Sequence, residues 1–497
     1  MAPLQYKEYG VVKSIKGCIV NLTGFENCIN GQLVQFGFGT EGIIIGFDQE
    51  ETQVLLIKEK SSLTSGTRAV MTLEPFNAAV GDKFIGRIVN VLAEPLDDLG
   101  PLEPDAYYPI FAQAPSVLDR EILKETVETG IKIVDTMLPI GRGQRQLVLG
   151  DKMTGKTTIC TDVILNQRGK DVVCIYCCIG KSKSALDRVV NLFKDKKAFE
   201  YSIVVAAMAG TSPGQQYLAP YIACSLGEYF MRKGGHVFIA FDDFTKHAWA
   251  YREISLLLSR PPGRESYPGD IFYLHSRMIE RAAKLSQELG GGSITFFPIV
   301  ETLEGDLTGY IPTNLVSMTD GQIYLNASLF GEGFKPAIDL GLSVSRVGTK
   351  VMWPILKKLS GSLRLDYLQY RQRLKVSTLK VGGAPSEDAT SEMRSGEIVT
   401  ELLTQPKDSP VDMIEQIVVF FGFARKIIFE LTSEQITKLK NNIFSFAEKH
   451  YPNLLKEISE KKDLTDEIEE QLKKLYSEYI RLLHEEERNQ PDLSVSE

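Results

Sequence analysis

A phosphate-binding loop is predicted where the chain reads GDKMTGKTT. Gly150, Gly155, Lys156 and Thr157 stand at the spacing of the P-loop motif. Glycines let backbone N–H groups converge on phosphate oxygens, and the following helix adds partial positive charge. Lysine reaches the outer phosphates, while the threonine hydroxyl is suited to ligate Mg²⁺. The predicted nucleotide-binding residues of this loop are Gly150, Asp151, Lys152, Met153, Thr154, Gly155, Lys156, Thr157 and Thr158.

An aspartate that complements the loop ends a later apolar run, VFIAFDD. Asp242 closes this run, as expected for a carboxylate in the outer shell of the nucleotide's metal ion. A turn at the end of a strand is the alternative interpretation. The accompanying P-loop favours the metal role, so Thr157 and Asp242 are the predicted metal-binding pair.

Lys181, in the stretch CCIGKSKS, bears on whether a bound nucleotide is hydrolysed. A nucleotide-hydrolysing motor is expected to place an acid here. Lysine has an ordinary pKa of about 10.4, so it is protonated near neutral pH and cannot accept a proton from water. Burial can depress that pKa, but neighbouring phosphates favour the charged form. Lys181 then either holds phosphate or faces solvent beside Lys183, and both interpretations predict binding without turnover.

Continuous apolar runs separated by helical stretches surround these motifs. Strands buried on both faces have this pattern, which predicts a mainly parallel sheet covered by helices. The P-loop itself lies between an apolar run and the helix-compatible stretch TTICTDVILNQ. The predicted strands are QLVLG (146–150), DVVCIYCCIG (171–180), SIVVAAMA (202–209), HVFIAFDD (236–243) and SITFFPIVE (293–301).

Short strands and frequent turn residues over about 7–74 predict a small antiparallel barrel at the N-terminal end. After about residue 350 the strand signal stops and helical periodicity begins. The predicted domains are therefore a β-barrel over 1–75, an α/β P-loop domain over 76–350 and a helical bundle over 351–497.

In the bundle, a capped helix is predicted to start near Thr465. Residues 381–396 are predicted to be an exposed loop, and 488–497 a frayed tail. The predicted core positions of the last helix are Ile468, Leu472, Leu475, Tyr479 and Leu482.

The composition of the 497-residue protein excludes several classes of protein. It is 43% hydrophobic with a net charge of −8, which argues against a nucleic-acid partner. No apolar run is long enough to span a bilayer, and the stretch MAPLQYKEYG has neither an apolar signal core nor an Arg-rich amphipathic pattern. Any membrane link is therefore expected to come through partners. Cys174, Cys177 and Cys178 alternate faces along a strand and are interpreted as buried thiols.

From GRGQRQLVLGDKMTGKTT onward, the sequence resembles the alpha subunits of F-type ATP synthases. The stretches that carry the resemblance include YREISLLLSRPPGRESYPGDIFYLHSRMIERAAKLS (251–286), YIPTNLVSMTDGQIYL (310–325) and PAIDLGLSVSRVG (336–348). The resemblance implies a barrel, a RecA-like nucleotide-binding domain and a helical bundle. It also implies ATP or ADP with Mg²⁺ as ligand, and an alternating ring of three alpha and three beta subunits around a gamma-type shaft. The expected location is the cytoplasmic face of the cell membrane.

The same resemblance implies roles for residues outside the P-loop. Lys335 and Pro336 match the positions that pack the adenine, with Gln405 nearby. Arg346 matches the arginine that reaches into the neighbouring beta subunit's catalytic site, and Ser343 and Ser317 match positions lining that interface. An arginine supplied in trans can match the charge spread over a transferring phosphoryl group.

Several positions depart from the family pattern. Met153 and Lys407 each replace a usual glutamine, and Lys181 replaces the glutamine of alpha subunits and the glutamate of beta subunits. The barrel is also expected to begin about twenty residues earlier in the sequence than in the family. A specialised paralogue coupled to a partner other than the usual proton-driven membrane sector is therefore an alternative. A catalytic hexameric ATPase and a ring-shaped RNA translocase are the others, disfavoured by Lys181 and by the acidic charge respectively.

Overall fold

The computed structural model describes residues 8–377 and 387–489, and contacts between Cα atoms divide the protein into two compact units. The three-domain boundaries stay a prediction. The first unit is Met1–Leu123, Arg142–Cys160 and Gln167–Gln322; the second is Lys124–Gly141, Thr161–Asn166 and Ile323–Glu497.

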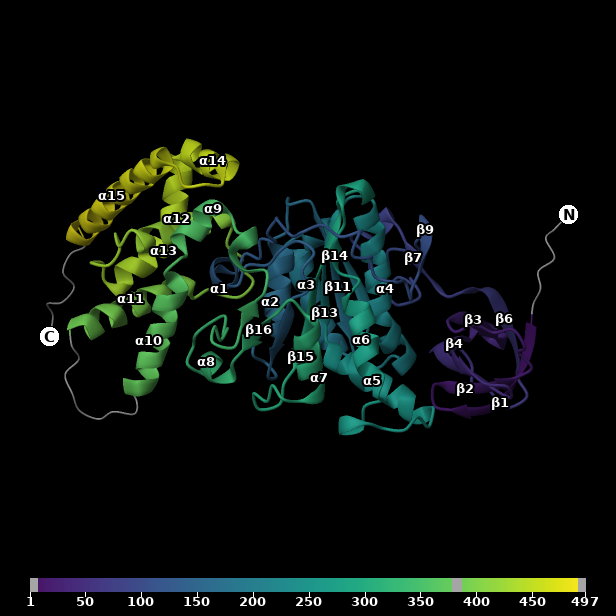
Figure 1. The fold of residues 1–497 in the computed structure, drawn as a ribbon. Coiled ribbons are helices and arrows are strands. Elements are labelled where there is room, and N and C mark those ends of the chain that lie inside the picture. Colours follow the sequence, from purple (N-terminus) through teal and green to yellow (C-terminus); the bar gives the residue numbers. More distant parts are fainter. Residues whose placement is uncertain (1–7, 378–386, 490–497) are drawn as a thin grey trace, which may run out of the picture. The chain divides into compact units, whose positions relative to one another are not determined.

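The first unit begins with the predicted antiparallel barrel (Figure 1). Its six strands close in the order β1-β2-β5-β4-β3-β6. Alternating side chains, among them Val20, Leu22, Val34 and Val54, fill the interior, which confirms the fold predicted for this segment. The strands are β1 (Glu8–Lys16), β2 (Ile19–Thr23), β3 (Gln32–Phe36), β4 (Glu41–Phe47), β5 (Thr52–Lys58) and β6 (Arg68–Pro75).

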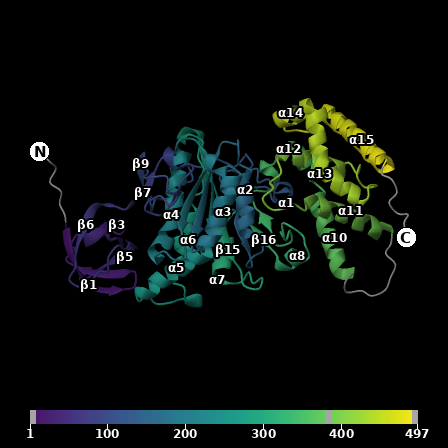
Figure 2. The ribbon, with the colours of Figure 1, turned by 180° about the vertical axis from the view of Figure 1, so that it is seen from behind.

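A parallel sheet in the order β10-β15-β13-β11-β12-β8 follows in the same unit. Helices lie on both sides of it, as the two opposite views show (Figures 1 and 2). All five predicted strands are present, because continuous apolar runs suit strands covered on both faces. They are β10 (Leu147–Gly150), β11 (Val172–Ile179), β12 (Ser202–Ala207), β13 (His236–Asp242) and β15 (Ser293–Glu301).

The remaining elements of this unit are short strands and the covering helices. They are β7 (Asn77–Val80), β8 (Ile88–Val89), β9 (Ala106–Pro109), β14 (Ala283–Lys284), α3 (Lys183–Asp195), α4 (Pro213–Arg232), α5 (Phe244–Leu257), α6 (Ile271–Ile279) and α7 (Tyr310–Met318). Helix α2 (Lys156–Leu165) follows the P-loop. Cys174, Cys177 and Cys178 are buried free thiols, as predicted.

The second unit contains the predicted helical bundle (Figure 1, green to yellow). Phe420, Phe421 and Tyr476 are among its fully buried side chains. Its elements are α1 (Lys132–Met137), β16 (Gly321–Leu325), α8 (Ala327–Gly331), β17 (Val344–Ser345), α9 (Pro354–Leu359), α10 (Leu363–Ser377), α11 (Glu387–Leu403), α12 (Met413–Ala424), α13 (Ser433–His450), α14 (Pro452–Lys461) and α15 (Asp466–Asn489).

Two details of the bundle correct the sequence predictions. Residues 387–396, predicted to be a loop, form the first part of α11, while 381–386 lie outside the described residues. Polar composition misled here because a helix needs only one apolar stripe, which α11 supplies later with Ile398, Val399 and Leu402. In α15, Leu482 is 38% exposed and Leu483 is buried in its place. The tail predicted over 488–497 is described only as far as Asn489, which is helical.

The predicted start of α15 is confirmed. The Thr465 hydroxyl accepts a hydrogen bond from the Ile468 N–H at 3.4 Å. A threonine at this position satisfies one of the N–H groups that a helix terminus leaves without an intrahelical partner.

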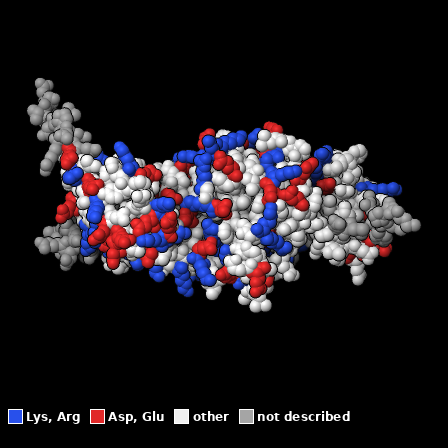
Figure 3. Space-filling view, turned by 90° about the horizontal axis from the view of Figure 1, so that it is seen from above, with Lys and Arg blue, Asp and Glu red and all other residues white. Residues whose placement is uncertain are grey.

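Acidic and basic side chains are interspersed over the face drawn in Figure 3. No helix in the described part of the protein has the length and apolar character needed to cross a bilayer. Among the same residues, no group of three or more His, Cys, Asp and Glu side chains is arranged to hold a metal ion.

A buried lysine joins α1 to the end of α11 in the second unit. The Lys132 ammonium donates to the carbonyl oxygens of Leu402 and, at 3.1 Å, Thr404. These carbonyls lie at the C-terminal end of a helix, where a cation is favourable. Lys132 is only 4% exposed, and its burial lowers the pKa of the ammonium to about 7.

This burial predicts a pH-dependent contribution to stability. The folded pKa of Lys132 is about 7 and the unfolded value about 10.4, so between these two pH values the unfolded state holds more protons. The penalty for burying the charge therefore falls as pH rises through this window. The melting temperature of the wild type, relative to Lys132→Met, should rise by a few degrees from about pH 7 to about pH 10 in a fluorimetric melt. A difference that stays constant with pH would contradict this account.

Candidate nucleotide-binding site

The P-loop occupies the carboxyl edge of the parallel sheet. It leaves β10 at Gly150 and enters α2 at Lys156. Ligands of open α/β sheets bind at this edge, because the loops that leave parallel strands gather there. Gly155 has a φ of 103°, and a Cβ added there would meet no atom within 4 Å. The loop therefore has the backbone conformation and the open space that a phosphate needs.

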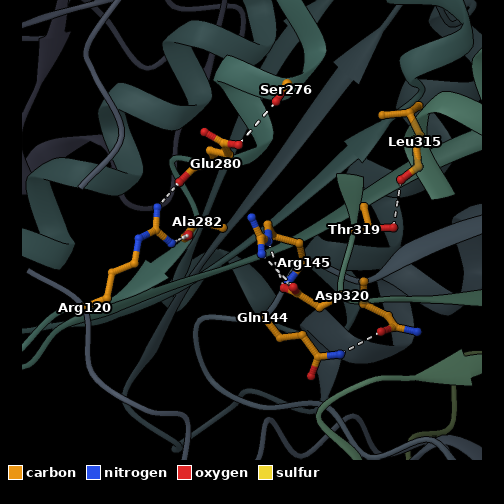
Figure 4. A network of polar contacts seen from close by, with 10 residues as sticks. Arg120, Gln144, Arg145, Ser276, Glu280, Ala282, Leu315, Thr319 and Asp320 are labelled. Carbon is orange, nitrogen blue, oxygen red and sulfur yellow. Dashed lines mark hydrogen bonds and ion pairs between the residues drawn. The ribbon is translucent and has the colours of Figure 1, made fainter. Parts of the chain in front are cut away.

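An ion pair fixes the strand that leads into this loop (Figure 4). The Arg145 guanidinium donates to both oxygens of Asp320, at 2.8 and 2.6 Å. The Asp320 N–H donates to the Arg145 carbonyl oxygen at 2.9 Å, so backbone and side chain both hold this point. Arg120, drawn in the same view, donates to the carbonyl oxygens of Ala282 and Glu280.

The P-loop lysine is buried and turned onto its own loop. The Lys156 ammonium donates to the carbonyl oxygen of Gly150 at 2.8 Å and to that of Asp151. Burial lowers its pKa, and the nearby carboxylates of Glu301, Asp243 and Asp242 oppose that effect. This ammonium and the adjoining N–H groups can donate hydrogen bonds to a negatively charged phosphate.

Asp242 lies beside Thr157, as the predicted metal role requires. The Thr157 hydroxyl donates to Asp242 Oδ2 at 2.7 Å. The buried Tyr176 hydroxyl donates to the same oxygen at 2.8 Å. Sequence reasoning missed Tyr176; the signal was a tyrosine within an apolar strand, whose hydroxyl needs a buried partner.

Parallel pairing brings Lys181 to the same carboxylate. Cys178 of β11 is in register with Asp242 of β13, so the loop after β11 passes over the end of β13. The Lys181 ammonium lies 2.6 Å from Asp242 Oδ1 and 3.8 Å from Asp243 Oδ2. The interpretation that this lysine faces solvent is therefore wrong.

The charges of this group are mutually dependent. Burial opposes the charge on Lys181, but attraction by Asp242 and Asp243 outweighs it, and the pKa of Lys181 rises above its ordinary value. Burial, followed by repulsion from Asp242, raises the pKa of Asp243 to about 6. Lys181 is therefore a cation at neutral pH and cannot act as a base.

The other P-loop side chains have structural or exposed positions. Asp151 Oδ1 accepts from the Thr302 hydroxyl at 2.6 Å and from the Gly305 N–H at 2.8 Å.

The Lys152 ammonium lies 3.3 Å from Glu301 Oε1. The Thr154 hydroxyl donates to the Asp151 carbonyl oxygen at 2.8 Å, Thr158 is half-buried and Met153 is 92% exposed.

The oxygen donors present fit a hard divalent cation. A threonine hydroxyl and a buried carboxylate, 2.7 Å apart, are the ligand types that Mg²⁺ takes beside phosphates. The other carboxylate oxygen faces the Lys181 ammonium. A metal ion would therefore share Asp242 with a side-chain cation.

The residues predicted to pack the adenine come together in the second unit. Lys335 is exposed, with its ammonium 5.0 Å from the centre of the Phe330 ring, and Pro336 follows it. The Gln405 N–H donates to the Lys335 carbonyl oxygen at 2.8 Å.

The Gln405 amide is occupied by backbone partners. Its Nε2 donates to the carbonyl oxygens of Gly130 and Ser409, and its Oε1 accepts from the Lys132 N–H at 3.1 Å. The Gln405 side chain therefore holds the backbone at Gly130, Lys132 and Ser409.

Ser343 and Arg346 differ sharply in environment. Ser343 is fully buried, and its hydroxyl accepts from the Tyr324 N–H at 2.9 Å. Arg346 is exposed and its side chain forms no hydrogen bond or ion pair with any residue the structure describes. Ser317 is also exposed, and its hydroxyl donates to the Asn314 carbonyl oxygen.

Comparison with known protein families matches two consecutive segments of the sequence to one family. Residues 130–345 match the nucleotide-binding domain of the ATP synthase alpha/beta family. Residues 353–479 match the C-terminal domain of the same ATP synthase alpha/beta proteins.

Relatives named ATP synthase subunit alpha cover nearly all of the sequence. The protein of Clostridium acetobutylicum is 43% identical over 485 residues, which is 98% of this protein and 96% of the relative. That of Clostridium botulinum strain Hall is 42% identical over 470 residues, 95% of this protein and 93% of the relative. That of Clostridium botulinum strain Alaska E43 is 41% identical over 477 residues, 96% and 94% of the two proteins. The chain therefore belongs to the family of F-type ATP synthase alpha subunits.

Proposed function

We propose that this protein is the non-catalytic, nucleotide-binding subunit of a rotary ATP synthase ring. The observation that supports it most directly is the ion pair between Lys181 and Asp242, at 2.6 Å. Hydrolysis would need a general base where this ammonium lies, and the loss of a general base lowers the rate about 10²–10⁴-fold. The subunit's own P-loop then holds ATP or ADP without turning it over.

In this proposal the P-loop residues Gly150 to Thr158 bind the phosphates. Lys156 supplies positive charge to the outer phosphates, and the N–H groups at the start of α2 donate hydrogen bonds to phosphate oxygens. Thr157 and Asp242 would hold Mg²⁺, which neutralises phosphate charge when bound. Lys335 and Pro336 flank the adenine, and Gln405 sets their backbone.

The catalytic contribution is proposed to be made in trans by Arg346. An exposed guanidinium with no partner among the described residues is free to meet a neighbouring subunit. Its planar donors match the oxygens of a transferring phosphoryl group. Ser343 contributes by fixing the backbone before this arginine, since its buried hydroxyl holds the Tyr324 N–H.

The assembly in this proposal alternates beta-type catalytic subunits with this one around a gamma-type shaft. Attachment to the cytoplasmic face of the cell membrane would then come through those partners. The names of the relatives support this environment, since each is a subunit of an ATP synthase.

Arg346→Ala should reduce ATP hydrolysis by the assembled ring while leaving nucleotide binding to the isolated subunit unchanged. The expected loss is about 10³–10⁵ in kcat, because the charge on the transferring phosphoryl group loses its stabilisation. Lys350→Ala, which removes another exposed cation from the same segment, is the matched control. Turnover by the Arg346 variant within a few-fold of the wild type would exclude the role in trans.

The isolated subunit should bind ADP and ATP in calorimetric titration but show no sustained hydrolysis. Lys156→Ala should abolish binding, since it removes the buried ammonium of the P-loop. Lys183→Ala, which removes an exposed cation after the same strand, should bind as the wild type does. Rapid hydrolysis by the isolated wild-type protein that disappears in Lys181→Met would refute a passive site.

A further inference from the structure

We propose that the Lys181 ammonium serves as a tethered cation beside the metal position, so that nucleotide binding at this site depends little on Mg²⁺. This inference rests on the proposed function, because it assumes that the P-loop holds a nucleotide. It adds that this protein supplies a large part of the positive charge otherwise brought by the metal.

Lys181 and the predicted metal ligand Thr157 contact the same carboxylate, that of Asp242. Asp242 Oδ1 faces the Lys181 ammonium at 2.6 Å, and Oδ2 accepts from Thr157 at 2.7 Å. Tyr176 donates to Oδ2 as well, so both oxygens are engaged in the described site. A divalent ion entering beside Thr157 has to share this carboxylate with the ammonium.

Backbone contacts fix the position of Lys181. Its carbonyl oxygen accepts from the Ala209 N–H at 2.8 Å, and the Gly180 N–H donates to the Ala207 carbonyl oxygen at 2.7 Å. Gly180 has a φ of 62°, and a Cβ there would lie 2.8 Å from Lys246 Cβ. The lysine is therefore delivered by a turn that is held to β12 and that needs glycine.

Burial makes the pairing strong enough to compete with a metal. The side chains of Asp242 and Asp243 are 1% and 3% exposed, and that of Lys181 is 24% exposed. Away from water, screening is weak and like charges within a few ångströms repel strongly. Lys181 should thus weaken the binding of a divalent ion at Asp242.

The same charges are available to a nucleotide that arrives without metal. Lys156 and Lys181 both act on Asp242 and Asp243, so both ammonium groups belong to one electrostatic cluster. When phosphates enter, these two fixed cations offset part of the negative charge without a divalent ion. An uncharged side chain at position 181 would leave this neutralisation to Mg²⁺.

The test compares ADP affinity with excess Mg²⁺ and with EDTA, by calorimetry on the purified full-length protein. The wild-type Kd should differ by less than about threefold between the two conditions. For Lys181→Gln, the Kd in EDTA should be higher than the Kd with Mg²⁺ by about tenfold or more. Lys181→Arg keeps the charge and should follow the wild type. Lys183→Gln, an exposed neighbour, is the matched control.

A direct metal readout accompanies the affinities. With ADP present, Mn²⁺ binding followed by electron paramagnetic resonance should be weaker in the wild type than in Lys181→Gln. The inference is overturned if wild-type binding needs Mg²⁺ as strongly as the glutamine variant does. It is also overturned if the variant loses affinity equally in both conditions, because Lys181 would then act on phosphate alone.

Failure of the underlying function gives a different result. If the wild type binds ADP neither with Mg²⁺ nor with EDTA, the proposed nucleotide site itself is refuted. If it binds ADP only with Mg²⁺, the site stands and the tethered-cation role falls.

Discussion

The buried carboxylate of Asp242 is the point on which the described site depends. Hydroxyl groups of Thr157 and Tyr176 and the ammonium of Lys181 converge on it from three different segments. A buried charge is costly unless it is paired and hydrogen-bonded. The contacts with this carboxylate therefore hold each of the three segments in place. The start of α2, the strand β11 and the loop after it are thereby fixed relative to β13.

The same requirement explains why a lysine next to a phosphate site behaves as a structural and electrostatic group. Two aspartates lie beside Lys181, and their attraction outweighs the cost of its burial. A glutamate at this position would bring a third carboxylate to the pair, whereas lysine offsets one of the two negative charges. Lys181 therefore lowers the net negative charge of this buried group.

In the second unit, buried polar side chains similarly serve the backbone. Gln405 and Lys132 direct their hydrogen bonds to carbonyl and N–H groups of adjoining segments. Asp135 accepts four hydrogen bonds, from Thr129, Gly130 and Gln416, and its burial raises the pKa of the carboxyl to about 6. Arg346 contrasts with these groups, because an exposed guanidinium without a described partner is available for another molecule.

Local sequence patterns were sufficient to predict the layers of the fold and the position of the glycine-rich loop. Strand periodicity and the apolar run ending at Asp242 are local patterns, and β10, β11, β13 and the barrel confirm the strands that they predict. The glycine spacing lies in the turn between β10 and α2. The partners of Lys181, Tyr176 and Gln405 became evident only from the folded arrangement. Their contacts follow from strand register and from segments far apart in sequence, about which local periodicity carries no information. The helix over 387–396 was missed because the buried apolar residues of α11, Ile398, Val399 and Leu402, come later in the helix.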